Sequence, residues 1–98
     1  MSKKIIVIGA GFAGLTAASY LAKQGNNVVL LEKNDQPGGR CRNWEKDGYS
    51  FDMGPSWYWM PEVFENFYRD FGFKTADFYE LKRLDPAYRV FFENGETA

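Results

Sequence analysis

Histidine is missing from this sequence of 98 residues, and cysteine occurs once, as Cys41. Without histidine the chain lacks the commonest metal ligand and the usual base of nucleophilic triads, so we expect no metal site. A single cysteine excludes an internal disulfide framework and suits a reducing compartment, which favours a cytoplasmic location. The formal net charge is only −1. The chain therefore lacks the basic surface typical of nucleic-acid-binding proteins, and we expect no nucleic-acid partner.

The composition is nevertheless that of a folded protein, with 45% hydrophobic, 18% aromatic and 26% charged residues. The length suffices for one small domain with a thin core. A basic start and an uncharged stretch from Ile5 to Ala22 resemble a targeting segment. However, Gly9, Gly11 and Gly14 dilute the hydrophobicity of this stretch, and their spacing favours a folded element instead.

The first third of the chain has the pattern of a βαβ unit. Residues 3–8 form a β-branched apolar run that predicts a buried parallel strand. Residues 13–24 are rich in alanine and are followed by Gly25, which predicts a helix and its end. Residues 28–32 predict a second buried strand that ends in an acidic residue. The expected class is therefore α/β, with a Rossmann-like unit at the start.

The remaining elements are predicted from turn residues and periodicity. We expect a hairpin over residues 42–52, which turns at 46–48, and a helix from Pro61 to about residue 71. Strands are expected at 79–84 and 88–92. An Asn-Gly turn is expected at 93–96, with its returning strand beyond the last residue.

Aromatic residues recur at helical spacing within the predicted second helix, at Phe64, Phe67, Tyr68 and Phe71. Such a stripe usually forms core. The alternative is that these residues and the Trp57-Tyr58-Trp59 run line a lipid channel or contact a bilayer.

The turn between the first strand and the first helix carries the pattern G-x-G-x-x-G, at Gly9, Gly11 and Gly14. The first glycine permits the tight turn, the second lets the backbone approach a pyrophosphate, and the third lets the helix pack closely on the strand. The helix N-terminus supplies N–H donors to an anion. The alternative is a glycine-rich turn without a ligand.

Glu32, at the end of the second predicted strand, can accept hydrogen bonds from ribose hydroxyls and would repel a ribose 2′-phosphate. Lys33 beside it weakens the exclusion of NADP. Together with the glycine pattern, Glu32 predicts an adenine dinucleotide but does not separate NAD from FAD. Gly38-Gly39-Arg40 offers a second close backbone approach and a guanidinium that suits phosphate, although an ordinary Pro-Gly-Gly turn is the alternative.

Four stretches together resemble the start of FAD-dependent amine-oxidase-like flavoproteins: I-V-I-G-A-G-F-A-G-L (6–15), L-L-E-K (30–33), P-G-G-R (37–40) and F-D-M-G-P (51–55). Residues 49–58 and 60–64 narrow the resemblance to bacterial-type phytoene desaturases and related carotenoid desaturases.

The resemblance implies a cofactor, FAD, and positions for it. Gly9, Gly11 and Gly14 would hold the pyrophosphate, and Glu32 the adenosine ribose. Gly39 and Arg40 would lie along the pyrophosphate and the ribityl chain, and Met53 and Gly54 would approach the flavin. Phe12, Ala13 and Lys33 complete the expected cofactor-binding set. No catalytic residue is assigned.

The resemblance also implies an oxidoreductase that removes hydride from a long, lipophilic polyene of the phytoene type and leaves a new double bond. Peripheral membrane association of the full-length protein stays open. Family members are several times longer, so we expect a truncated chain: residues 1–55 as part of the FAD-binding domain and 56–98 as the start of an α+β substrate domain. We expect this fragment to be inactive alone. The alternatives are an amine oxidase or another FAD oxidoreductase of the superfamily, and a non-catalytic nucleotide-binding or interaction module.

Overall fold

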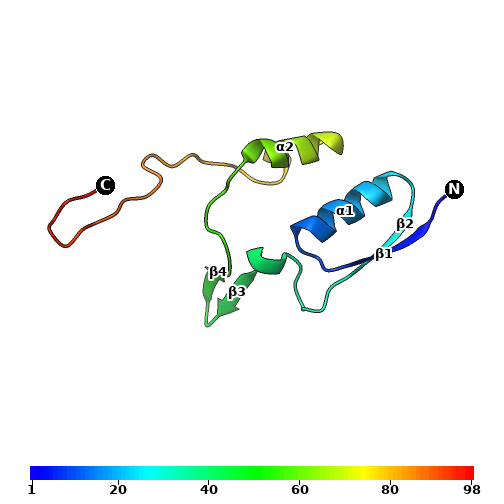
Figure 1. Cartoon of the computed structure of the whole chain (residues 1–98), viewed down its shortest axis with the longest axis horizontal. Coiled ribbons are helices and arrows are strands. Elements are labelled where there is room, and N and C mark those ends of the chain that lie inside the picture. Colours follow the sequence, from blue (N-terminus) through cyan, green and yellow to red (C-terminus); the bar gives the residue numbers. More distant parts are fainter. The chain divides into compact units, whose positions relative to one another are not determined.

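The computed structural model describes all residues from 1 to 98 and contains two compact units, Met1–Tyr58 and Trp59–Ala98. The first holds a βαβ unit, a short 3₁₀ helix and a hairpin, and the second holds one α-helix and one 3₁₀ helix (Figure 1). Each unit is described separately below.

The βαβ unit consists of β1 (Lys4–Ile8), α1 (Phe12–Lys23) and β2 (Asn27–Leu31). The two strands pair in parallel, with Lys4 opposite Asn27 and Ile8 opposite Leu31. Gly25 follows α1 in the left-handed conformation (φ +86°), where its N–H donates to the carbonyl of Ala22. The predicted Rossmann-like unit is confirmed, with each element within one residue of its expected bounds.

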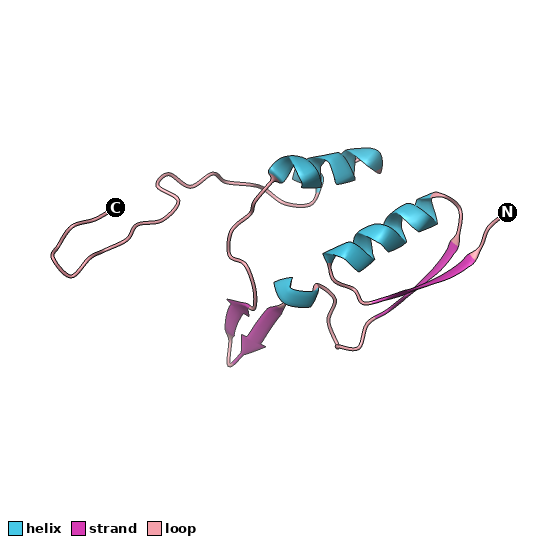
Figure 2. Cartoon of the chain, in the orientation of Figure 1, coloured by secondary structure: helices cyan, strands magenta, loops and turns pink.

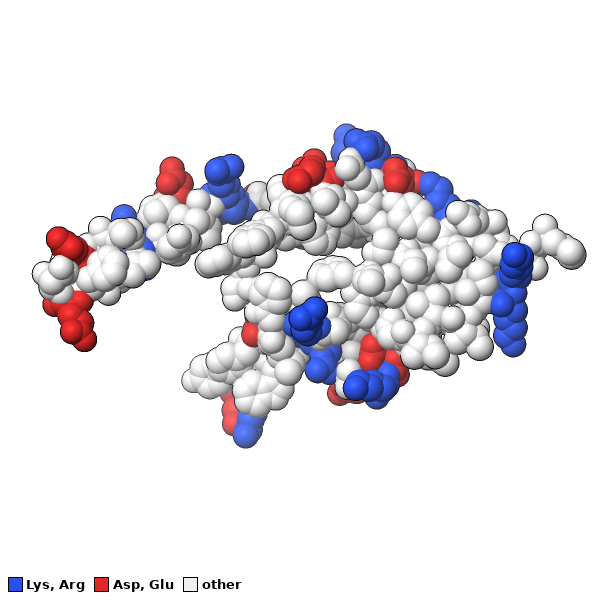
Figure 3. All heavy atoms as spheres, viewed as in Figure 1, with Lys and Arg blue, Asp and Glu red and all other residues white.

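One face of this two-stranded sheet is covered by α1 and the other is open. Side chains alternate along both strands between half-buried and exposed. The exposed positions include Ile6, Ile8, Val29 and Leu31. The surface over this unit carries few charged side chains (Figure 3). Ala10, which follows β1, is the single fully buried residue, at 2% exposure, so the core is thin, as the length predicts.

The second half of the first unit is built from turns and a hairpin. A 3₁₀ helix, η1, covers Gly39–Cys41. The strands β3 (Asn43–Lys46) and β4 (Tyr49–Asp52) pair in an antiparallel hairpin around Asp47-Gly48 (Figure 2). Both central residues have positive φ, +53° and +82°, as a tight hairpin turn of right-handed twist requires. The predicted hairpin is confirmed.

The second unit contains α2 (Pro61–Asp70) and the 3₁₀ helix η2 (Thr75–Asp77). Pro61 begins α2, and Gly72, with φ +81°, follows its end, as predicted. The aromatic stripe of α2 is half-buried. The rings of the stripe contact one another and the segment after η2. The ring centroids of Phe67 and Phe71 are 4.9 Å apart, and the ring of Tyr68 stacks on that of Phe78 with a centroid distance of 4.7 Å. These contacts agree with the interpretation of the stripe as core.

The prediction of strands at 79–84 and 88–92 is wrong. The structure has irregular backbone there, with one isolated antiparallel bridge between Phe91 and Thr97. A strand needs a partner along its length, and residues 80–98, which are all exposed, pair only locally, between residues 90–92 and 96–98.

The Asn-Gly turn at 93–96 is confirmed, since the N–H of Gly95 donates to the carbonyl of Phe92. The expectation that its return lies beyond the last residue is wrong, because Val90 and Ala98 already exchange two backbone hydrogen bonds. None of the helices combines the length and the hydrophobicity that a membrane span requires.

Candidate functional site

The turn between β1 and α1 presents backbone amides that no side chain of the turn caps. Gly9 has φ +101°, a conformation that favours glycine, and its N–H donates to the carbonyl of Leu31 at 2.7 Å. Gly11 is the N-cap of α1, makes no side-chain cap, and is followed by no acidic residue in the first turn. Phe12, Ala13 and Gly14 form that turn, where amides have no acceptor within the helix. The positive end of the helix dipole therefore faces a place suited to an anion.

Gly11 and Gly14 serve different purposes. A Cβ at Gly14 would lie 1.8 Å from the carbonyl oxygen of Gly9, so the turn itself requires this glycine. A Cβ at Gly11 would meet nothing nearer than the Cα of Gly39, at 4.0 Å. The packing of the protein does not require glycine at position 11. No side chain of the protein lies within 4 Å of the position that a Cβ of residue 11 would take.

The carboxylate of Glu32, directly after β2, lies against the same turn. Its Oε2 accepts a hydrogen bond from the N–H of Ala10 at 2.7 Å. Its Oε1 accepts two from Asn34, one from the backbone N–H at 3.0 Å and one from Nδ2 at 3.1 Å. The backbone N–H groups of Ala10 and Asn34 are the largest causes that lower the pKa of Glu32, since they favour the charged form. Glu32 is therefore ionised at neutral pH and fixed in direction.

A second glycine segment closes on the first. The N–H of Gly38 donates to the carbonyl of Ala10 at 2.7 Å. Gly38 and Gly39 have φ values of +117° and +60°, which other residues rarely adopt. A Cβ on Gly39 would come within 3.2 Å of the Cα of Gly11, so the two backbones approach more closely than side chains would permit. The structure thus brings together the two glycine motifs predicted separately.

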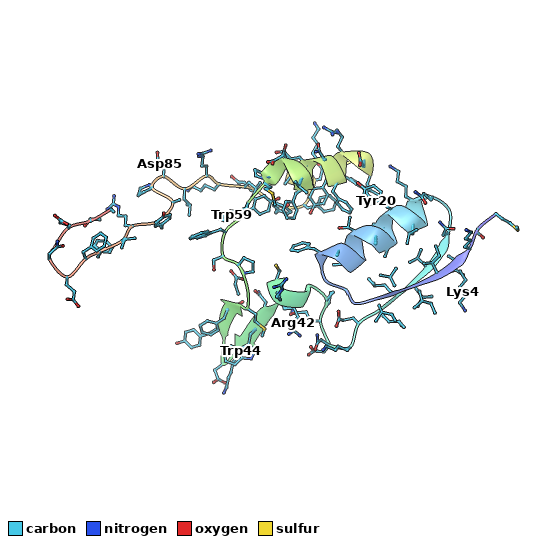
Figure 4. All side chains as sticks on the ribbon, viewed as in Figure 1. Lys4, Tyr20, Arg42, Trp44, Trp59 and Asp85 are labelled. Atoms are coloured by element: carbon cyan, nitrogen blue, oxygen red, sulfur yellow. The ribbon has the colours of Figure 1, made fainter.

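Two arginines flank this second segment and differ in their contacts. Arg40, in η1, is exposed. Arg42 is half-buried between η1 and β3, and its Nε donates to the carbonyl of Gly39 at 2.9 Å (Figure 4). Arg42 therefore holds the glycine segment, whereas the guanidinium of Arg40 stays accessible to a ligand.

The end of β4 returns to η1. The N–H of Met53 donates to the carbonyl of Arg42 at 2.9 Å, which extends the hairpin ladder by one pair. A Cβ on Gly54 would lie 1.8 Å from the carbonyl oxygen of Arg40, so position 54 accepts only glycine. Met53 and Gly54 are therefore held beside Arg42 and Arg40.

All eleven predicted cofactor-binding residues lie in the first unit. Lys33 is exposed and reaches the site through its backbone, whose hydrogen bond helps to lower the pKa of Glu32. Two residues that sequence reasoning missed also contact the site, Asn34 and Arg42. Asn34 could have been predicted, because an Asn two residues after an acidic residue at a strand end indicates a local turn in which the two side chains meet. Nothing local marks Arg42. No group of three or more acidic, cysteine or histidine side chains in the structure could hold a metal ion.

Comparisons with known proteins agree with this geometry. A family described as the NAD(P)-binding Rossmann-like domain matches residues 7–71. The chain is 56% identical over 92 residues to a carotenoid 3,4-desaturase of Haloarcula japonica, and this covers 94% of the chain and 19% of the relative. It is 47% identical over 92 residues to a zeta-carotene-forming phytoene desaturase of Myxococcus xanthus, again 94% of the chain and 18% of the relative.

A solved structure is also similar. The crystal structure of a fatty acid isomerase from P. acnes that produces CLA matches 99% of the chain, and 22% of that protein, with a TM-score of 0.60 and 29% identity. The chain thus spans about a fifth of the length of the relatives that it matches. The match over residues 7–71, together with the observed βαβ unit and its glycine turn, shows that the chain belongs to the family of NAD(P)-binding Rossmann-like domains.

Proposed function

We propose that this chain binds FAD through its first unit and is the FAD-binding part of an oxidoreductase that desaturates a carotenoid precursor. The observation that carries the proposal is the open space beside Gly11, at an uncapped helix start and against the Gly38-Gly39 backbone. A pyrophosphate needs this combination of close approach and free N–H donors.

The residues present fit the two ends of such a cofactor. The turn from Gly9 to Gly14 would hold the pyrophosphate with backbone amides, and Glu32 would accept hydrogen bonds from the adenosine ribose. The ionised carboxylate would repel a ribose 2′-phosphate, which favours FAD or NAD over NADP. Gly39 and Arg40 would continue along the pyrophosphate and ribityl chain, because the backbone of Gly39 lies close to that of Gly11 and the Arg40 side chain is exposed. Met53 and Gly54 would lie towards the flavin.

FAD supplies a flavin ring that accepts hydride when it is bound. The residues of this chain bind and orient the cofactor: amides fix its phosphates, Glu32 fixes its ribose, and Arg42 keeps the second glycine segment in place. No residue of the chain is proposed as a catalytic acid or base.

The substrate class is proposed from the relatives. Both curated relatives reported above are named for desaturation of carotenoids. We infer a lipophilic polyene as substrate. We also propose that residues 1–55 belong to the FAD-binding domain and that residues 56–98 begin a substrate domain. The substrate domain would determine which polyene is bound.

A second candidate is another FAD oxidoreductase or isomerase that acts on long-chain lipids. The similarity to a fatty acid isomerase favours it, because a protein that contains a similar segment is named for a different reaction, the isomerisation of a fatty acid. Expression of the entire gene product in cells that accumulate phytoene separates the two candidates. Formation of coloured carotenoids supports the desaturase, and unchanged phytoene with turnover of unsaturated fatty acids supports the second candidate.

FAD binding is tested directly on the purified chain. We expect quenching of FAD fluorescence on titration, and little binding of NADPH. Gly11→Val should remove FAD binding by filling the space beside the turn, while the helix content measured by circular dichroism stays the same. A chain that binds NADH but not FAD would overturn the choice of cofactor, and equal affinity of the Gly11→Val variant for FAD would overturn the site.

A further inference from the structure

We propose that Asn34 is a positioning residue of the nucleotide site: its side-chain amide holds Glu32 so that one carboxylate oxygen, Oε2, is directed to the ribose. The inference rests on the proposed function, because it concerns the same ribose site. It adds a residue that neither the glycine pattern nor the strand-end acid identifies.

The hydrogen bonds on Glu32 are unevenly divided between its two oxygens. Asn34 donates twice to Oε1, at 3.0 Å from its backbone and at 3.1 Å from Nδ2. These two bonds engage both lone pairs of that oxygen. Oε2 accepts one bond, at 2.7 Å from the N–H of Ala10, and keeps a lone pair. A ribose hydroxyl therefore has Oε2 as its acceptor.

The location of Ala10 links this carboxylate to the phosphate-binding turn. Ala10 is buried, lies between Gly9 and Gly11, and receives the N–H of Gly38 on its carbonyl. Its own N–H reaches Oε2 of Glu32. Rotation of the carboxylate away from Asn34 would break this bond as well, because both oxygens are then displaced. Asn34 thus fixes the distance between the ribose acceptor and the turn that would hold the phosphates.

The charges near Glu32 do not provide an alternative anchor. Lys33 and Asp35 are the charged neighbours along the chain, and both are exposed. The low pKa of Glu32 is caused mainly by the backbone hydrogen bonds from Ala10 and Asn34. Burial opposes them, and the backbone of Lys33 and the side-chain amide of Asn34 lower the pKa by smaller amounts. No charged group contributes to this shift. The orientation of the carboxylate therefore depends on neutral donors, of which the Asn34 amide is the one from a side chain.

The first test measures the contact without any ligand. The side-chain carboxyl carbon of Glu32 is followed by NMR as pH is lowered, in the wild type and in Asn34→Ala and Asn34→Asp. We expect the pKa of Glu32 to rise in Asn34→Ala, because one donor is lost, and to rise further in Asn34→Asp, because a second carboxylate faces the first. Gln36→Glu is the matched control, since it adds the same charge in the same exposed loop. An unchanged Glu32 pKa in both Asn34 variants would overturn the proposal.

The second test measures the consequence for ribose recognition. ADP and 2′-deoxy-ADP compete with FAD for the chain, and the ratio of their dissociation constants reports the hydroxyl contact. We expect Asn34→Ala to weaken FAD binding roughly three- to tenfold and to bring this ratio close to one. Gln36→Ala should leave both quantities unchanged. A purely structural loss would weaken both nucleotides equally and keep the ratio, which would overturn the proposal.

A double substitution separates this proposal from the proposed function. In a Glu32→Ala background, Asn34→Ala should have no further effect on the ADP to 2′-deoxy-ADP ratio, because Asn34 acts only through Glu32. A further change in that background would show direct contact and would overturn the positioning role. If the wild type binds neither FAD nor ADP, the proposed function fails, whereas the NMR titration still decides whether Asn34 holds Glu32.

Discussion

The amide of Gly38 donates a hydrogen bond of 2.7 Å to the carbonyl of Ala10 and so joins two glycine segments that lie far apart in the sequence. Ala10 is also the one fully buried residue, and its N–H binds Glu32. The N–H and the carbonyl of Ala10 thus connect the first glycine turn, in which Ala10 lies, with Glu32 and with the second glycine segment. A larger side chain at position 10 would have no space, because only 2% of Ala10 is exposed.

The two glycines of the first motif should respond differently to alanine. In Gly14→Ala the new methyl group collides with the carbonyl of Gly9, and we expect a loss of stability of about 3 kcal/mol or more, seen as a lower midpoint in urea. In Gly11→Ala the methyl group makes only an ordinary van der Waals contact with the Cα of Gly39, so the free energy of unfolding should change by less than about 1 kcal/mol. FAD affinity should nevertheless fall in Gly11→Ala. Equal destabilisation by the two variants would contradict the different roles assigned to these glycines.

Gly54 should be as intolerant as Gly14, for a reason that lies in another part of the chain. A methyl group at position 54 would displace the carbonyl of Arg40 and with it η1. We expect Gly54→Ala to shift the backbone amide resonances of Gly39 and Arg40 and to weaken FAD binding about tenfold, with the βαβ unit unchanged. Gly11→Ala is the control, because its added methyl group causes no steric clash in the protein without ligand. Resonances of residues 39–41 that stay in place would show that the contact between Gly54 and Arg40 is absent in solution.

Arg42 and Arg40 should differ when each is replaced by lysine. Arg42→Lys keeps the charge but removes the Nε–H that binds the carbonyl of Gly39. A part-buried acceptor without a partner costs about 1–3 kcal/mol, so hydrogen exchange at the amides of residues 38–41 should accelerate in this variant. Arg40→Lys should leave exchange in the free protein unchanged, because Arg40 is exposed. Equal exchange rates in the two variants would argue against the Arg42 contact.

Tyr68 should titrate at unusually high pH. Burial, together with the hydrogen bond to Tyr79, raises the pKa of Tyr68 to about 12 from its ordinary value of 10.0. A raised folded-state pKa means that the neutral phenol stabilises the fold below pH 10, and that this contribution is lost as pH rises from 10 to about 12.

The measurement for Tyr68 is the absorbance of phenolate as a function of pH. We expect the increase in phenolate absorbance at the highest pH to disappear in Tyr68→Phe. This substitution keeps the ring stacked on Phe78 and removes the hydroxyl. A wild-type titration in which every tyrosine ionises near pH 10 would be the contrary result.

The local elements of this fold could be predicted from the sequence because each depends on residues close together. The β-branched run before Gly9, the alanine-rich stretch before Gly25 and the Asp47-Gly48 turn each limit the backbone over a few residues. The same holds for Pro61 and Gly72 around α2. The predicted strands at 79–84 and 88–92 failed for the complementary reason, since β propensity becomes a strand only where a partner supplies hydrogen bonds.

The sequence by itself determined the βαβ unit, the glycine turn and the strand-end position of Glu32, because steric preference and periodicity act over short distances. Only the tertiary structure decided that Gly38 reaches Ala10, that Gly54 rests on Arg40 and that Arg42 binds Gly39. These contacts depend on how the hairpin returns the chain to the first turn. That path is set by the combined geometry of many residues, and no short pattern in the sequence specifies it.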